Sequence, residues 1–92
     1  MRLANRTVLI TGGGRGIGAA TARVAAAEGG RVVIADMLEA EGEATAAAIR
    51  AEGGRALFVR TDVTAEAGCV RLAQAAVDAF GGIDALICCA GI

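Results

Sequence analysis

The sequence contains no Lys, His, Tyr, Trp or Pro, so all nine of its basic residues are arginine. Histidine, lysine and tyrosine are frequent general acids and bases, and their absence leaves Asp, Glu and Cys as the main side chains for proton transfer. A formal net charge of −1 gives no basic surface of the kind that binds nucleic acid. We therefore expect neither a nucleic-acid-binding protein nor a catalytic centre built on histidine or lysine.

Long apolar runs and paired cysteines are also lacking. No stretch approaches the roughly 20 apolar residues that span a bilayer, and the N-terminal MRLANRTVLI lacks the apolar segment and cleavage site of a secretory signal. The three cysteines, Cys69, Cys88 and Cys89, form no CxxC pair, so neither a disulfide framework nor a metal site is indicated. These features predict a cytoplasmic protein with reduced thiols and no membrane contact.

Short apolar runs alternate with longer alanine-rich stretches along the sequence. Hydrophobic residues make up 55% of the 92-residue chain, which suits one small folded domain over residues 1–92. Four short, nearly continuous apolar runs are typical of strands buried on both faces, and the alanine-rich stretches between them are predicted to be helices. The predicted strands are Val8–Ile10, Arg31–Ala35, Ala56–Val59 and Ala85–Cys88, and the predicted helices are Gly16–Glu28, Glu39–Glu52 and Ala65–Phe80.

The third predicted helix has the clearest helical pattern. Thr64 is a plausible N-cap, and Glu66 lies in the first turn, where the helix dipole favours an anion. Apolar residues recur at three- and four-residue steps and define its predicted apolar face, which consists of Val70, Ala73, Val77 and Phe80.

The order of these elements predicts a Rossmann-like, doubly wound α/β fold. Glycine pairs at 29–30, 53–54 and 81–82 follow the three helices, as expected of residues that end a helix. Right-handed crossovers between parallel strands give a sheet in the order 3-2-1-4. We expect this sheet to be truncated after its fourth strand, which leaves an uncovered apolar edge through which isolated chains self-associate.

A glycine-rich segment, TGGGRGIG at residues 11–18, directly follows the first predicted strand. Backbone without Cβ atoms lets a pyrophosphate approach the N–H groups at the start of the following helix. Asp36 ends the second predicted strand, 18 positions after Gly18, where an acid can bind an adenosine ribose. Strand, glycine turn, helix and acid together favour a dinucleotide site over a merely flexible turn.

Other nucleotide sites compete with this interpretation. A P-loop requires a lysine and is excluded. The common GxGxxG/A spacing is present at Gly14, Gly16 and Ala19, but the longer spacing Gly12-xxx-Gly16-x-Gly18 begins nearer the strand end and fits better. A site for S-adenosylmethionine stays an alternative, although an acidic residue would be expected there just ahead of the glycines.

In four places the sequence resembles the short-chain dehydrogenases/reductases. The matching segments are TGxxxGIG at 11–18, the second-strand acid Asp36, the adenine-contacting pair Asp62-Val63, and the fourth-strand segment 84–92, which ends in NNAG in the family. The resemblance implies a Rossmann fold that binds NAD or NADP and moves a hydride between nicotinamide and an alcohol or ketone. It implies cofactor contacts from Thr11, Gly12, Gly14, Arg15, Gly16, Ile17, Gly18, Asp36, Asp62, Val63, Cys89, Ala90 and Gly91.

The sequence departs from the family pattern in two respects. Cys88-Cys89 stands where the family usually has Asn-Asn, which removes amide hydrogen bonds along the cofactor cleft. We interpret this pair as small packed residues rather than as a redox switch. The family's catalytic Ser and Tyr-x-x-x-Lys lie beyond the fourth strand, and the chain contains no Tyr or Lys.

We therefore expect the cofactor-binding half of an NAD-dependent oxidoreductase that acts on a small alcohol or ketone and is a homo-oligomer when complete. The 92-residue chain alone is expected to be catalytically incomplete, because the general acid is missing. The other hypothesis is a nucleotide-binding or regulatory module that never turns over substrate.

Two residues indicate different cofactors. In the resembling family a basic residue at the position of Arg15 often holds the 2′-phosphate of NADP, whereas Asp36 would accept hydrogen bonds from the ribose hydroxyls of NAD. Repulsion between a phosphate and the Asp36 carboxylate outweighs the attraction of one exposed arginine, so NAD is expected to bind more tightly than NADP. The other arginines, including Arg50, Arg55 and Arg60, are interpreted as solvated charges.

Overall fold

The computed structural model describes residues 3–12, 16–62 and 66–88, and these form alternating strands and helices. The predicted order β-α-β-α-β-α-β is confirmed. The elements are β1 (Thr7–Thr11), α1 (Gly16–Ala27), β2 (Arg31–Asp36), α2 (Glu39–Ala51), β3 (Arg55–Arg60), α3 (Glu66–Phe80) and β4 (Ala85–Cys88).

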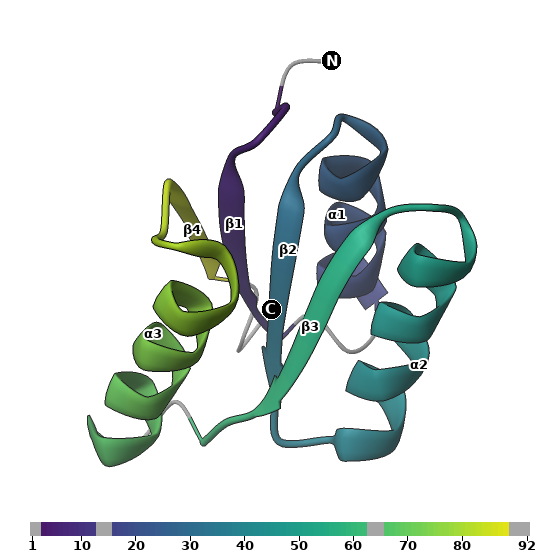
Figure 1. Cartoon of the computed structure of the whole chain (residues 1–92). Helices are drawn as coiled ribbons and strands as arrows, with labels where there is room; N and C mark the ends of the chain where they lie inside the picture. The colour runs from purple at the N-terminus through teal and green to yellow at the C-terminus, as the bar shows by residue number, and fades with distance from the viewer. Residues whose placement is uncertain (1–2, 13–15, 63–65, 89–92) are drawn as a thin grey trace.

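All the strands are parallel and lie in the order β3-β2-β1-β4, as predicted. Figure 1 shows α1 and α2 on one side of the sheet and α3 on the other. Because the chain continues outward from β1 to β3 and then returns to the other side of β1, the two flanking layers come from different crossovers. The fold is a Rossmann-like, doubly wound α/β sheet.

The fourth strand is fixed to the first by paired hydrogen bonds at its start. The Asp84 backbone N–H donates to the Thr7 carbonyl over 2.8 Å, and the Thr7 N–H donates to Asp84 Oδ2 over 2.7 Å. From there the ladder runs from Val8 opposite Ala85 to Thr11 opposite Cys88. The carboxyl end of β4 therefore lies beside the carboxyl end of β1.

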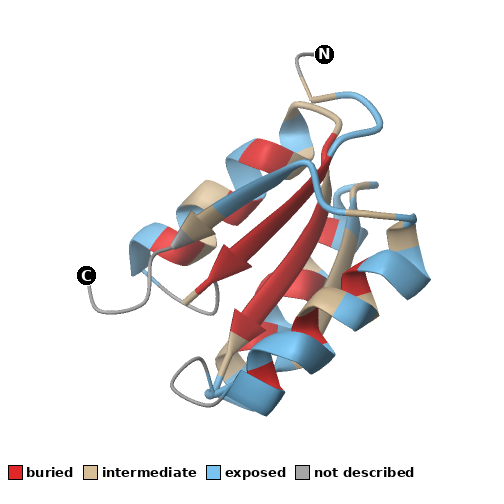
Figure 2. Ribbon diagram, turned by 90° about the vertical axis from the view of Figure 1, so that its left-hand side faces the viewer, coloured by how far each residue is buried: buried red, intermediate tan, exposed pale blue. Residues whose placement is uncertain are grey.

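Side chains of the inner strands alternate between two cores. Val8 and Ile10 pack with α1 and α2, whereas Leu9 packs with α3, as a period of two requires. Every residue of β1 is buried, and so are the four central residues of β2, which appear red in Figure 2. The prediction of strands buried on both faces is confirmed for β1 and β2.

The outer strands do not share that burial. The central residues of β3 are half-buried, and Leu86 of β4 is 58% exposed. An outer strand has a neighbour on one side only, so an apolar run in the sequence does not by itself determine how deeply the strand is buried.

The apolar face predicted for the third helix is wrong. Val70 and Val77 are 63% and 46% exposed, while Leu72 and Ala76 are buried against Leu9 and its neighbours. Leu72, Ala76 and Phe80 also recur every four residues, so two apolar stripes on one helix compete and packing on the sheet selects between them. Only Phe80 of the predicted face packs against this core.

The first two helices end one residue before the predicted positions, at Ala27 and Ala51. The glycine pair after each helix reverses the chain: the first glycine has positive φ in all three pairs, as predicted. The proposed cap Thr64 and the predicted start at Ala65 lie outside the described residues. No helix among the described residues is long and apolar enough to cross a membrane.

Candidate cofactor site

The candidate site lies at the carboxyl edge of the sheet, where β1, β2 and β3 each lead into a turn. Parallel alignment places Thr11 opposite Ala35, and Asp36 opposite Arg60. The residues that follow these strand ends, Gly12, Met37 and Thr61, are therefore neighbours along one edge. The strand order reverses beside β1, because β2 and β3 lie on one side of it and β4 on the other, and in open α/β sheets ligands bind at this point.

The first turn lies between β1 and α1, and the described residues on either side of it, Gly12 and Gly16, are both glycines with positive φ. Gly12 has φ of 71° and donates its N–H to the Ala35 carbonyl over 2.7 Å, which ties the start of the turn to β2. Gly16 has φ of 60°, and a Cβ atom built on it would have no other atom within 4 Å. A side chain at position 16 would therefore project into open space.

The N-terminus of α1 is suited to an external anion. Its first turn contains no acidic residue, Ile17 is 61% exposed, and Gly18 is buried. The N–H groups of a first helical turn have no partner within the helix and carry a partial positive charge. With no carboxylate of its own in that turn, α1 leaves this charge available to a ligand. Gly14 and Arg15, which the sequence also predicts to contact the cofactor, lie outside the described residues.

The second turn, between β2 and α2, holds a carboxylate in place. Asp36 is half-buried, and its Oδ1 accepts a hydrogen bond from the Leu38 backbone N–H over 3.0 Å. Its carbonyl accepts the Thr61 N–H over 2.9 Å, which fixes the same residue to the end of β3. The first bond orients the carboxylate and the second fixes the backbone, so the acid is held at the carboxyl edge of the sheet.

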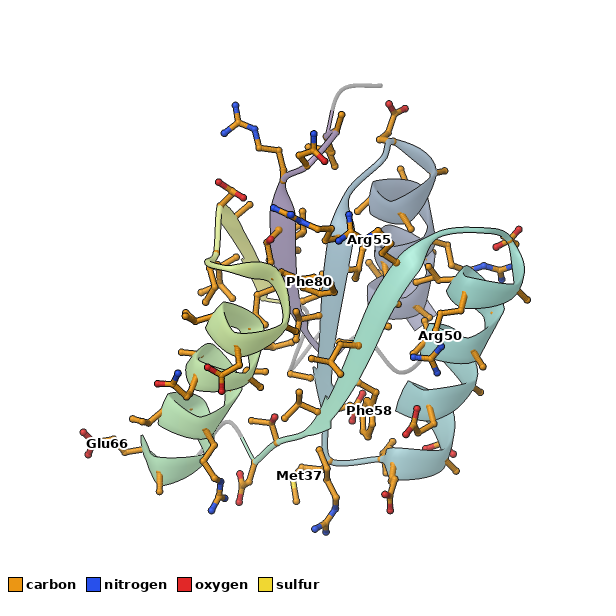
Figure 3. The ribbon with its side chains drawn as sticks, viewed as in Figure 1. Met37, Arg50, Arg55, Phe58, Glu66 and Phe80 are labelled. Carbon is orange, nitrogen blue, oxygen red and sulfur yellow. The ribbon has the colours of Figure 1, made fainter. Side chains whose placement is uncertain are left out.

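An exposed apolar side chain stands next to this acid. Met37 is 54% exposed and projects at the carboxyl end of β2, as Figure 3 shows. An exposed apolar side chain beside a polar edge offers a surface against which a planar aromatic ring can pack.

The third turn, between β3 and α3, is fixed through Thr61. This threonine is 3% exposed, and its hydroxyl donates to the Val59 carbonyl over 3.0 Å. The next residue, Asp62, is exposed. A Cβ on Gly68 would lie 2.7 Å from the Asp62 carbonyl oxygen, so the first turn of α3 packs directly on this backbone.

Roles for Leu38, Thr61 and Gly68 were not predicted from the sequence. The bond from Leu38 to Asp36 follows a known signal, because Asp side chains often bind the backbone N–H two residues later. The closeness of Gly68 to Asp62 depends on how the helix packs and has no local signal. Val63, Cys89, Ala90 and Gly91 lie outside the described residues.

Comparison with known proteins identifies the family. The sequence profile described as short chain dehydrogenase matches residues 6–92. This chain belongs to the short-chain dehydrogenase family. Because that match extends over almost the whole chain, the described fold and the glycine turn at the first strand end are those of a family member.

Three relatives illustrate the family around this chain. The chain is 50% identical over 91 residues to 2,5-dichloro-2,5-cyclohexadiene-1,4-diol dehydrogenase LinX of Sphingobium indicum. It is 48% identical over 97 residues to trans-4-hydroxycyclohexanecarboxylate dehydrogenase of Sinomonas cyclohexanicum, and 43% identical over 91 residues to a 3-alpha-(or 20-beta)-hydroxysteroid dehydrogenase of Mycobacterium bovis. The matches cover 99% of this chain but 36%, 38% and 34% of the respective relatives.

A solved structure also matches nearly all of this chain but only about a third of its own length. A double mutant of a short-chain dehydrogenase/reductase from Serratia marcescens superimposes with a TM-score of 0.88 at 32% identity, over 94% of this chain and 36% of that protein. The chain therefore spans about a third of the length of the relatives that it matches.

Proposed function

We propose that this chain is the NAD(H)-binding part of an oxidoreductase that transfers a hydride between nicotinamide and an alcohol or ketone. The observation that carries the proposal is the N-terminus of α1, where an acid-free first turn faces open space at Gly16. Helix N-termini of this kind bind phosphate groups, and the carboxylate at the end of β2 supplies the second contact of a dinucleotide site. A bound nicotinamide dinucleotide would supply the hydride chemistry.

Each turn has a proposed task in holding the cofactor. Thr11, Gly12, Gly16 and Gly18 form the turn against which the pyrophosphate lies, with Gly14 and Arg15 in the same loop. Asp36 accepts hydrogen bonds from the adenosine ribose, and Asp62 with Val63 contacts adenine. Ile17 approaches the nicotinamide side, as do Cys89, Ala90 and Gly91 after β4. Met37 adds a surface for the adenine ring, since it is exposed beside Asp36.

The substrate of the whole protein is proposed to be a secondary alcohol on a ring, or the corresponding ketone. The support is that the three relatives above are named for a cyclohexadiene diol, a hydroxycyclohexane carboxylate and a hydroxysteroid. Reduction of a ketone needs a proton donor beside the bound substrate, and the 92-residue sequence contains no Tyr, Lys or His. We expect the chain alone to bind cofactor without turning over an alcohol.

NAD is the proposed cofactor in preference to NADP. A 2′-phosphate would meet the Asp36 carboxylate and would replace the hydroxyl donor that the carboxylate binds, at a cost of about 2 to 4 kcal/mol. One exposed arginine at position 15 returns about 1 kcal/mol. The difference gives an expected preference for NAD of about 5- to 150-fold.

Calorimetric titration of the chain tests this proposal directly. NAD should bind to a single site, NADP more weakly, and S-adenosylmethionine not at all. Asp36→Ala should narrow or reverse the preference between NAD and NADP. Tighter binding of S-adenosylmethionine than of NAD would overturn the proposed cofactor class. Equal or tighter binding of NADP by the unchanged chain would show that Asp36 is not the residue that binds the ribose.

A further inference from the structure

Arg60, the last residue of β3, lies next to the acid proposed to choose the cofactor. The parallel register places Arg60 directly opposite Asp36. In a sheet, residues opposite each other on neighbouring strands lie about 4.8 Å apart and project to the same face. The ladder continues beyond this pair, because the Thr61 N–H donates to the Asp36 carbonyl. The position of Arg60 is therefore set by the backbone.

The face shared by Arg60 and Asp36 follows from the alternation along both strands. Ile34 and Phe58 both pack in the core under α1 and α2, and each lies two residues before one member of the pair. Arg60 and Asp36 thus emerge beyond that core, on the side of the sheet where α2 begins. Figure 3 shows Phe58 pointing toward α2, which marks this side.

Acidic residues occupy this end of β2 and the start of α2. Besides Asp36, the first turn of α2 contains Glu39 and Glu41. Arg60 is exposed, and its guanidinium makes no ion pair within 4.0 Å with any described residue. An exposed arginine that has no ion pair among the described residues, beside a carboxylate proposed to bind a ribose, can donate to a phosphate added at that ribose.

We propose that Arg60 is a specificity-determining residue that lets this site accept a 2′-phosphate on the adenosine ribose. The inference rests on the proposed function, because it places that ribose at Asp36. Arg60 reduces the repulsion between Asp36 and the phosphate and donates hydrogen bonds to phosphate oxygens. It makes no contact with an unphosphorylated ribose. Its effect is confined to NADP and narrows the preference for NAD that Asp36 creates.

Binding of NAD and NADP to the 92-residue chain, measured by calorimetry without any turnover, provides the test. The two ligands differ only in the 2′-phosphate, so the ratio of their dissociation constants isolates the contact in question. Arg60→Gln should weaken NADP binding about three- to tenfold and change NAD binding less than about twofold. Arg60→Lys, which keeps the charge, should recover most of the NADP affinity.

Arg55→Gln is the matched control. Arg55 is exposed on the same strand and loses the same charge, but it lies at the opposite end of β3, over the ring of Phe80. The control should leave the ratio unchanged at moderate salt, because charges farther apart than a Debye length are screened. Thermal unfolding of each variant establishes that it is folded before it is titrated.

The possible outcomes separate the inference from the proposed function. A ratio that Arg60→Gln does not change, or that Arg55→Gln changes equally, overturns the role of Arg60 while NAD binding still supports the dinucleotide site. Failure of the unchanged chain to bind either nucleotide overturns the dinucleotide site and the role of Arg60 with it.

Discussion

Two helices begin at the same edge of the sheet, one strand apart, and their N-termini are built in opposite ways. The first turn of α1 contains no acid and begins at Gly16, where an added Cβ would meet open space. The first turn of α2 contains Glu39 and Glu41 and follows Asp36, whose carboxylate binds the Leu38 N–H. Both helices present a positive dipole end to this edge, but only α2 compensates for it with its own carboxylates.

For the proposed dinucleotide, this difference would favour a single orientation along the edge. A pyrophosphate is attracted to the start of α1 and repelled from the start of α2, where a ribose with hydroxyl donors is preferred instead. The same arrangement predicts that changes of charge or backbone at the N-terminus of α1 affect NAD binding, whereas changes at the N-terminus of α2 mainly affect stability. The substitutions below test that opposition, beginning with the largest expected effect.

Gly16→Val should abolish most dinucleotide binding. Valine is strained at φ of 60°, and its side chain would fill the open space in front of the turn. We expect NAD affinity to fall on the order of 100-fold, because the pyrophosphate can no longer approach the backbone. Calorimetric titration with NAD measures the loss.

Gly53→Val separates the loss of the site from backbone strain. Gly53 also has positive φ, 86°, and open space around it, but it lies after α2 at the opposite edge of the sheet. Both variants should lose a similar amount of stability, about 1 to 2 kcal/mol. Only Gly16→Val should lose NAD binding, and an equal loss in Gly53→Val would assign the effect to general destabilisation.

The features of this edge that could be predicted from the sequence are the local ones. The glycine-rich segment and Asp36 are recognised from residue types within a few positions of each other, and the strand order follows from the general handedness of parallel crossovers. The packed face of α3 could not be predicted in the same way, because Val70 with Val77 and Leu72 with Ala76 both have helical spacing. Burial of the second pair results from where the helix lies on the sheet.

The close packing of α2 against β3 is a second feature that no local sequence pattern predicts. A Cβ on Gly42 would lie 2.0 Å from Cε1 of Phe58, so the helix approaches β3 closely only because this residue is glycine. Residues 42 and 58 are distant in sequence, and neither residue type alone predicts the contact. The start of α2, and hence the position of its acids, depends on this packing.

Gly42→Ala should therefore disturb α2 and leave α1 intact. The added methyl group forces Phe58 or the helix to move, and overpacking of this kind costs about 1 to 3 kcal/mol of the free energy of unfolding. Denaturant unfolding measures the cost, and Phe58→Leu in the same chain should recover part of it. No interaction between the two substitutions would contradict the proposed contact.

Ile17→Glu should make the start of α1 resemble the start of α2. Ile17 is 61% exposed, so the glutamate needs no repacking, and a carboxylate in the first turn stabilises a helix by about 0.3 to 1 kcal/mol. The same carboxylate repels a pyrophosphate, and we expect NAD to bind about 5- to 10-fold more weakly. Ile17→Gln serves as the uncharged control. If Ile17→Glu were more stable and still bound NAD as tightly as the unchanged chain, the proposal that this helix end is the anion site would be contradicted.

Glu39→Gln is the reverse change at α2 and should have the smallest effect. The helix loses one favourable carboxylate near its N-terminus, which costs about 0.3 to 1 kcal/mol at low ionic strength and less in high salt. Binding of NAD should change less than about twofold, because the proposed function places the pyrophosphate at α1 and assigns the ribose contact to Asp36. Glu66→Gln removes an equivalent first-turn carboxylate from α3 and should destabilise the chain by a similar amount. If Glu39→Gln alone instead strengthened NAD binding as much as Ile17→Glu weakens it, both helix N-termini would act on the same anion. The assignment of pyrophosphate to α1 and ribose to α2 would then be wrong.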